Sequence, residues 1–529
     1  MAHQARFAWG RRADARRLQA SSSTGSAMYA APHHDRDRID GLATFAAASF
    51  LTGMGLVAAL ARVGAPDRLV EALGPLIALL GLTIVGVATR TARLADFLAA
   101  RRAVPPLYGG LAFAATAAGF VGALGAGATG RAPLPWPAVA LGLVGAALIV
   151  GPLIRRAGAS ALSDVLATRF PAAPTRWAFA VALWAAGALT ATAGLDMAVD
   201  VLVAHVGQSR RAAEIVVALA LATTIVPGGM KGLLWSDAAS AGGALAIAAI
   251  GAALAWSGAG APAPSLAEAA RGWLAPSLAH PDSASLLLDT ASALGVGAFF
   301  AFVAPAVGAP PRQGGRAGIY GLAFALAGLA LGATSLAAFA PDAAAAARSP
   351  TTSALVGAAI WLPALALARA GVLGAARAAG IDLSTAYARL TVLASRRIAR
   401  IRLTMLAVIA LAAVVSDLRL VDPPRAMTLA LALDVALIVP SLLLALVSGG
   451  RSPAAFAAVA AGLAVLAHRG FAAGPSARPA EILIGALIAG ATALLVGAVV
   501  GLFTPRAAGA RKIGARADPF SDLPFEANE

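Results

Sequence analysis

Apolar stretches of roughly 18 to 22 residues recur along the chain, and each is long enough to cross a hydrocarbon core about 30 Å thick. They run from Gly41 to Phe503 and are separated by short polar segments. Of the 529 residues, 59% are hydrophobic and 12% are charged, whereas a soluble domain carries about 25% charged residues. This pattern excludes a disordered chain, argues against a large soluble enzyme, and predicts an all-α polytopic protein embedded in the lipid bilayer.

Arginine, proline and glycine residues divide the apolar sequence into fourteen candidate transmembrane helices. These helices are expected at residues 41–62, 69–89, 108–130, 136–153, 177–204, 213–228, 235–257, 284–306, 318–340, 353–371, 403–418, 427–447, 453–468 and 480–503. If residues 1–40 form a cytoplasmic tail, fourteen spans also place a second tail, residues 504–529, in the cytoplasm. The cytoplasmic segments then carry 30 of the 41 lysine and arginine residues, as the positive-inside rule predicts.

The basic residues that produce the net charge of +16 are spread over the short segments between spans. This distribution favours contact with anionic lipid headgroups over binding of nucleic acid. The chain has no cysteine and lacks the Walker A, H-E-x-x-H and G-x-S-x-G motifs. We therefore expect neither enzymatic activity nor a resident cofactor, and the sequence carries no signal of an oligomeric state.

Ionisable residues inside the predicted spans are the strongest indication of function, because a charge buried in lipid costs about 2.5–3.5 kcal/mol or more. Asp196 and Asp200 are four residues apart on the fifth span, so both project from one helix face. Two close carboxylates repel each other, and such a pair can bind a proton or a cation. The alternative is that both lie near the outer interface and are solvated.

Asp434 is a single carboxylate in an apolar span, and Arg369 near the inner end of the tenth span is one candidate partner. A role in helix packing or at the membrane interface is the alternative for this residue. For four other acidic residues a structural role near span ends is favoured, because carboxylates complement helix N-termini. These residues are Asp237, Asp289, Glu214 and Glu481.

Hydroxyl groups outnumber amides in the predicted membrane interior. Asn528 is the only asparagine, whereas a site for a sugar or nucleoside needs several directional donors and acceptors. The candidate site hydroxyls are those of Thr116, Thr190 and Thr192. This inventory suits a small solute better than a polyhydroxylated one.

Two predicted spans contain sequences that weaken a helix. The third span is rich in glycine after its midpoint, and the eighth contains several glycines and Pro305. Weak helices at matching positions of two five-helix halves are typical of inverted-repeat transporters, whose substrate lies at the breaks.

Three stretches resemble motifs of the sodium:solute symporter family, and within it the acetate-permease-like members. Residues 95–102 (ADFLAARR) are similar to the family's A-D-F-x-x-A-G-R segment, and residues 161–170 (ALSDVLATRF) to its T-L-x-D-x-L-x-x-R-F loop. Residues 228–237 (GGMKGLLWSD) are close to its G-G-M-x-A-V-x-W-T-D signature. The order and spacing of the three stretches are those of the family.

The resemblance implies a leucine-transporter-type fold, with two inverted five-helix repeats at about residues 108–447 within a membrane domain of residues 41–503. It also implies sodium-driven symport of a small organic solute, with a short monocarboxylate as a candidate, in the cytoplasmic (inner) membrane of a bacterium. Backbone carbonyls at Ala115 and Ala118 align with one sodium site of the family. Leu367 and Ala368 occupy the positions of its hydroxyl pair, and neither side chain can ligate sodium.

Two hypotheses for function follow. The first is a secondary transporter of a small solute that couples to Na⁺ or H⁺, with Asp196 and Asp200 replacing the lost sodium ligands or carrying protons. The second is a degenerate member that keeps the fold for binding or regulation and no longer transports. Loss of transport on substitution of either aspartate by asparagine would separate the two.

Overall fold

A computed structural model describes residues 33–125, 136–156, 159, 161–256, 283–310, 313–339, 350–383, 394–447, 451–473 and 478–504. The chain forms two compact units, residues 1–45 and residues 46–529. The described residues of the first unit belong to the beginning of helix α2, and all other features discussed below lie in the second unit.

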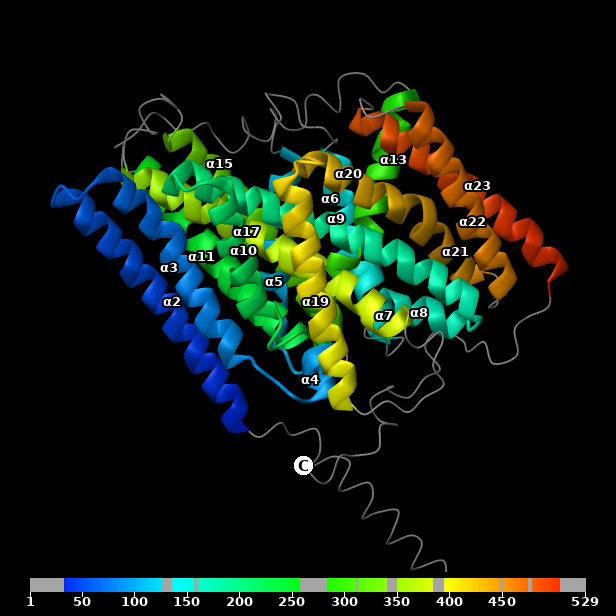
Figure 1. Ribbon diagram of the computed structural model, residues 1–529, viewed down its shortest axis with the longest axis horizontal. Helices are drawn as coiled ribbons and strands as arrows, with labels where there is room; N and C mark the ends of the chain where they lie inside the picture. Colours follow the sequence, from blue (N-terminus) through cyan, green and yellow to red (C-terminus); the bar gives the residue numbers. More distant parts are fainter. Residues whose placement is uncertain are drawn as a thin grey trace, which may run out of the picture. The chain divides into compact units, whose positions relative to one another are not determined.

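The described residues form helices and no strand (Figure 1). In chain order the elements are α2 (His33–Arg62), α3 (Asp67–Ala88), α4 (Leu94–Ala99), η1 (Ala100–Arg102), α5 (Pro106–Gly125), α6 (Trp136–Gly145), η2 (Ala146–Val150), α7 (Gly151–Arg156), α8 (Leu162–Arg169), α9 (Ala173–Val206), α10 (Arg210–Ile225), α11 (Met230–Trp256), α13 (Ser283–Ala298), η3 (Phe300–Val303), α14 (Ala304–Gly308), α15 (Gly314–Phe339), α17 (Pro350–Arg377), η4 (Ala378–Leu383), α19 (Ala394–Asp417), α20 (Pro423–Leu433), η5 (Asp434–Ile438), α21 (Val439–Val447), α22 (Ser452–Ala473) and α23 (Pro479–Phe503).

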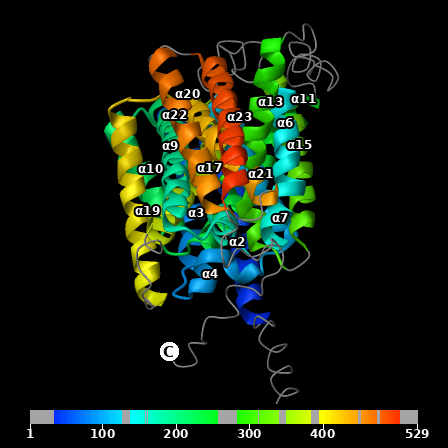
Figure 2. The ribbon, with the colours of Figure 1, turned by 90° about the vertical axis from the view of Figure 1, so that its right-hand side faces the viewer.

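Each of the fourteen predicted spans overlaps a helix or consecutive helical segments. Within the described residues, ten helices are long and apolar enough to cross a membrane, or eleven if one bent pair counts as a single span. The protein is therefore an integral membrane protein. Helices α22 and α23 lie side by side along their length (Figure 2).

The predicted boundaries are wrong by six residues or more at three helices. Helix α2 begins at His33, within the predicted N-terminal tail, rather than at residue 41. Helix α19 begins at Ala394 rather than at residue 403, and α17 continues to Arg377 rather than ending at residue 371. The α19 boundary differs because the predicted span was placed after the last of the arginines that open this helix, Arg402. An arginine can remain helical at a membrane boundary, since its aliphatic stem packs on apolar surface while the guanidinium reaches water or a partner.

The prediction of two interrupted spans is confirmed for the eighth, whereas the third shows no break over its described residues, 108–125. The eighth span is broken at Phe299, where α13 and the η3–α14 segment meet at a bend of 44°. The third span is a continuous helix, α5, through the glycines that it contains up to Gly125. Those glycines provide room for packing: a methyl group added to Gly119 would lie 2.2 Å from the carbonyl oxygen of Pro363 on α17.

Helices α9 and α17 contact each other backbone to backbone through glycines. A methyl group added to any of three glycines in this contact would lie 2.4 to 2.6 Å from a backbone nitrogen of the facing helix. The pairs are Gly187 with Ala375, Gly194 with Ala368, and Gly371 with Ala191. Small residues permit such close approach in membrane helices, where packing and not the hydrophobic effect holds helices together.

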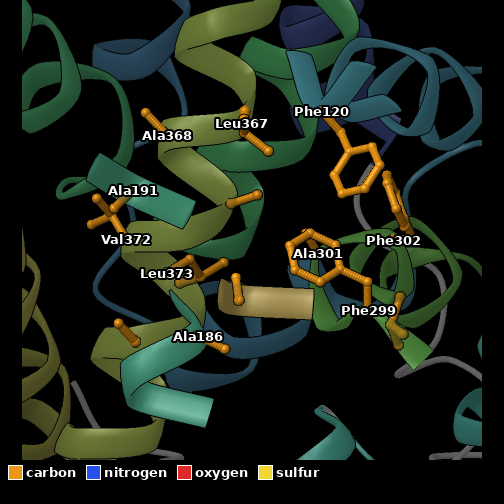
Figure 3. Packing of buried hydrophobic residues seen from close by; sticks show 14 of the residues in the cluster. Phe120, Ala186, Ala191, Phe299, Ala301, Phe302, Leu367, Ala368, Val372 and Leu373 are labelled. Carbon is orange, nitrogen blue, oxygen red and sulfur yellow. The ribbon is translucent and has the colours of Figure 1, made fainter. Parts of the chain in front are cut away.

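An aromatic cluster packs α5 against the broken helix. The ring centroids of Phe120, Phe299 and Phe302 lie 5.4 to 5.6 Å apart, in tilted and edge-on arrangements that aromatic pairs prefer. Figure 3 shows this cluster beside the α17 residues Leu367 and Ala368. The break in the eighth span is therefore anchored in the core of the second unit.

Candidate functional site

The two aspartates predicted to share a face of α9 do so, and both contact one arginine. Arg210 at the start of α10 donates a hydrogen bond from Nη1 to Asp200 Oδ1 at 2.8 Å and a second, from Nη2, to Asp196. The Asp196 side chain is buried, whereas that of Asp200 is 58% exposed. A single guanidinium, from a residue outside the predicted spans, therefore serves both carboxylates.

Two further side chains complete this cluster, which joins α9, α10 and α19. Ser416 on α19 donates a hydrogen bond to Asp196 Oδ1 at 2.7 Å, and Glu214 Oε1 lies 3.2 Å from Arg210 Nε. Glu214 was expected to complement a helix end, and it instead pairs with Arg210 four residues earlier on the same helix. These contacts hold α9, α10 and α19 together. A role of Asp196 and Asp200 in transport stays a prediction.

A second ion pair joins α11 and α17 in the interior. Arg369 Nε lies 2.7 Å from Asp237 Oδ1, and Arg369 Nη2 donates a hydrogen bond to Ser240 Oγ at 2.8 Å. Both charged side chains are fully buried. The sequence predicted only a structural role near a span end for Asp237, so this ion pair was not predicted.

Asp434 does not pair with Arg369, which corrects the partner considered from the sequence. Arg369 binds Asp237 instead. The Asp434 side chain is fully buried in a π-helical turn, η5, that separates α20 from α21. Neither of its carboxyl oxygens has a hydrogen-bond partner among the described residues. An ionisable group in this environment is a candidate for carrying a proton.

The predicted site hydroxyls are directed to the backbone of their own helices. Thr116 Oγ1 donates to Ala112 O at 3.1 Å, and Thr190 Oγ1 to Ala186 O at 2.7 Å. Thr192 Oγ1 donates in the same way to the carbonyl four residues earlier, at 2.9 Å. In this structure all three donors are used within the helix, while the hydroxyl oxygens keep the capacity to accept.

The positions that align with a sodium site by resemblance lie among apolar residues. Leu367 and Ala368 are fully buried, and Leu367 packs against Gly119 of α5. Ala115 is buried in contact with the alanines of two other helices, whereas Ala118 is exposed. Among the described residues, no group of three or more His, Cys, Asp or Glu side chains is arranged to hold a metal ion.

Two of the stretches that carry the resemblance lie against each other. Gly229, at the turn before α11, has a φ of +56°, and a side chain there would lie 2.6 Å from the carbonyl oxygen of Phe97 in α4. Arg402 on α19 joins the same segments by donating to Thr91 O at 2.7 Å and Pro227 O at 2.9 Å. The glycine is needed both for its backbone conformation and for this approach.

No protein-family profile matches the chain, and no curated protein sequence matches it. Among solved structures, the chain is similar to a Na⁺-coupled sialic acid symporter in a substrate-bound outward-open state. The match has a TM-score of 0.63 and 14% sequence identity, and it covers 84% of this chain and 99% of the symporter.

A further match is a nucleobase-cation-symport-1 family transporter in a closed conformation with bromovinylhydantoin bound. It has a TM-score of 0.44 and 15% identity, and it covers 80% of this chain and 97% of that transporter.

The chain has the leucine-transporter-type fold, as the sequence predicted. The bent helix pair of the eighth span, Ser283–Ala298 with Phe300–Gly308, lies within this fold. The predicted likeness to acetate-permease-like members stays a prediction.

Proposed function

We propose that this protein is a secondary active transporter, a symporter that moves a small organic solute by alternating access. The observation that carries the proposal is the broken helix α13–η3–α14, bent by 44° at Phe299, within this fold. Transporters of this architecture place substrate and coupling ions where helices are discontinuous, because unwound backbone offers polar groups inside the membrane. The fold of a Na⁺-coupled symporter supports the same class of function.

Protons are the favoured coupling ion over sodium. The positions aligned with sodium-ligating hydroxyls are the buried Leu367 and Ala368, and sodium, a hard cation, prefers oxygen ligands. The next residue along α17, Arg369, is fully buried in an ion pair with Asp237, so it supplies no oxygen ligand for sodium there either.

Asp434 is the favoured proton-carrying group. Its carboxyl is buried without a partner among the described residues, whereas Asp196 and Asp200 are engaged by Arg210. A carboxyl that lacks a compensating cation is stable in apolar surroundings when neutral and costly when charged. Such a group supports transport by taking up a proton on one side of the membrane and releasing it on the other.

The experiment that tests this function is uptake into proteoliposomes containing the full chain. Labelled acetate, pyruvate and similar small solutes are supplied while a Na⁺ gradient or an H⁺ gradient is imposed separately. Uptake that follows the H⁺ gradient alone is the expected result, and uptake that follows Na⁺ alone overturns proton coupling. If folded protein shows no gradient-driven uptake of any solute tested, the non-transporting alternative is favoured. The tight packing of Leu367 against Gly119 is consistent with that alternative.

A further inference from the structure

A groove open to the surface lies between the first half of α9, the turn η5 and helix α22. Its volume is about 700 Å³, within the range of sites for small ligands, roughly 300–1,000 Å³. Its walls come from positions between 173 and 185, between 433 and 437, and between 456 and 463. All three segments belong to spans that are long and apolar enough to cross the membrane. The groove therefore lies between membrane-spanning helices.

The exposed lining side chains continue the lipid-facing surface of the membrane domain into the groove. Trp177 and Val181 on α9 are 38% and 45% exposed, and Phe456 and Leu463 on α22 are 45% and 51% exposed. All twelve lining residues are hydrophobic, and none has a charged, hydroxyl or amide side chain. A hydrocarbon chain suits such walls, because apolar surfaces gain contacts with it and no polar group is left without a partner.

The groove has about the length of one leaflet of a bilayer. From Ala173 to Ala185 the axis of α9 advances about 18 Å, and half of a hydrocarbon core about 30 Å thick is about 15 Å. Ala173 is the first residue of α9, so the groove begins at one end of a span and runs toward the middle of the membrane. Trp177 lies about one turn from that end, and tryptophan is enriched beside lipid headgroups.

A positive charge lies at the end of the groove where α9 begins. Ser452, the first residue of α22, accepts hydrogen bonds from the backbone nitrogen of Ala172 at 3.3 Å and from Thr175 Oγ1 at 3.0 Å. Arg451 directly precedes Ser452 and donates to the carbonyl oxygen of Gly501. That partner is neutral, so the guanidinium keeps its positive charge. The phosphate of a lipid headgroup complements a basic residue in this position.

The deep end of the groove lies against the π-helical turn η5. Leu433 at the end of α20 and Leu437 of η5 line it, and the buried Asp434 lies between them in the sequence. π-Helical turns are rare, and apolar walls with no atoms on one side lose dispersion contacts. A hydrocarbon chain in the groove supplies those contacts to the turn that carries the buried carboxyl.

We propose that the groove holds one acyl chain of a phospholipid as a bound component of the protein, with the headgroup at the end beside Arg451. A transmembrane helix of a second copy, about 10 Å wide and 30 Å long, has a volume on the order of 2,400 Å³ and does not fit. The transported solute is not the occupant, because no residue of the broken helix lines the groove. The site therefore goes beyond the proposed function and does not depend on it.

The test measures quenching of Trp177 fluorescence by phosphatidylcholine brominated in its acyl chains, which is added to the full chain in lipid-free detergent. The protein has eight tryptophans, so the Trp177 signal is the difference between measurements with and without Trp177→Phe. Ala185→Phe fills the deep end of the groove, and Arg451→Gln removes the charge at the other end. Ile215→Phe is the matched control, because Ile215 on α10 is 61% exposed and does not line the groove.

We expect the quenching of Trp177 to saturate at about one phospholipid per protein. Ala185→Phe should weaken this saturable binding by about tenfold or more, the effect of crowding an apolar site. Arg451→Gln should weaken it by about fivefold, the effect of losing one basic residue beside a headgroup. Ile215→Phe should bind as the unchanged protein does.

The inference is overturned if quenching rises in proportion to the lipid without saturating, because Trp177 then faces only exchanging bulk lipid. Unchanged affinity in Ala185→Phe also overturns it, and unchanged affinity in Arg451→Gln overturns the placement of the headgroup. Absence of quenching at Trp177 overturns it as well, and a dimer in size-exclusion profiles would then identify a second copy as the occupant.

The titration of the unchanged protein decides the inference even if a variant does not fold. No solute and no ion gradient are present in this measurement. A bound lipid without gradient-driven uptake therefore leaves the groove assignment standing while the proposed function falls, and uptake without saturable lipid binding does the reverse.

Discussion

Arg369 on α17 and Asp237 on α11 form an ion pair at 2.7 Å, measured from Nε to Oδ1, with both side chains fully buried. The two residues are 132 positions apart in the sequence. An unpaired charge at this depth is very costly, so each residue depends on the other to remain inside the membrane domain. The pair therefore fixes how α11 and α17 lie against each other.

Removing one member of this pair should destabilise the protein more than removing both. Arg369→Met leaves the Asp237 carboxylate without its counter-ion, and we expect a loss of about 3–5 kcal/mol in the free energy of unfolding. The double variant Asp237→Leu with Arg369→Met should recover most of that loss, because no charge remains buried. Thermal unfolding in detergent measures both. A double variant no more stable than the single one would contradict this account.

Arg210 should matter more to stability than its exposed neighbour Arg211. Arg210→Gln leaves Asp196, Asp200 and Glu214 without the guanidinium that they share, and we expect a loss of about 2–4 kcal/mol. The Arg211 side chain is 82% exposed and lies 3.5 Å from Asp417. Arg211→Gln is therefore expected to change stability by less than about 0.5 kcal/mol. Equal Tm values for the two variants would argue against a structural role for the cluster.

Asp434→Leu should keep the protein folded and stop proton-driven uptake. Its carboxyl lacks a partner among the described residues, so an apolar replacement removes an unsatisfied polar group and should stabilise the protein by about 1 kcal/mol or more. Proton-driven uptake should fall to background if Asp434 carries the proton. The control is Asp417→Asn, at the end of α19, which should transport normally. Undiminished uptake by Asp434→Leu would exclude Asp434 as the proton carrier.

Two glycine-to-alanine substitutions should have opposite effects. Gly194→Ala places a methyl group 2.5 Å from the backbone nitrogen of Ala368, so α9 and α17 must move apart. We expect a loss of about 1–3 kcal/mol, the usual cost of overpacking. Gly81 on α3 has nothing within 4 Å of such a methyl group. Gly81→Ala should therefore stabilise its helix by about 0.5–1 kcal/mol, and paired Tm measurements check both directions.

The helices and the shared face of Asp196 and Asp200 could be predicted because they depend on local spacing. Apolar run length reports a span directly, and residues four apart on a helix always lie on one side. The pairing of Asp237 with Arg369 depends on how α11 and α17 pack against each other. The spacing of residues along the sequence gives no information on that packing. One signal was present in the sequence: an arginine within an apolar stretch needs a carboxylate at the same depth, and Asp237 was an available candidate.

Glycine content was the least reliable predictor of a break in a helix. The glycines of the third span suggested an interrupted helix, yet Gly119 lies in a continuous α5 and makes room for α17. The glycines of the eighth span accompany a real break at Phe299. The same residue type weakens a helix in isolation and permits close packing beside a neighbour. Only the partner helix decides between these outcomes.

Helices α9 and α17, whose backbones touch at three glycines, cannot slide or rotate past each other without a collision of main-chain atoms. The Arg210 cluster extends this restriction to α10 and α19. These four helices should behave as one rigid body during a transport cycle, and a cross-link between α9 and α17 should leave turnover intact. In the proposed transport cycle, the motion that exposes the solute alternately to the two sides then falls to the remaining core helices.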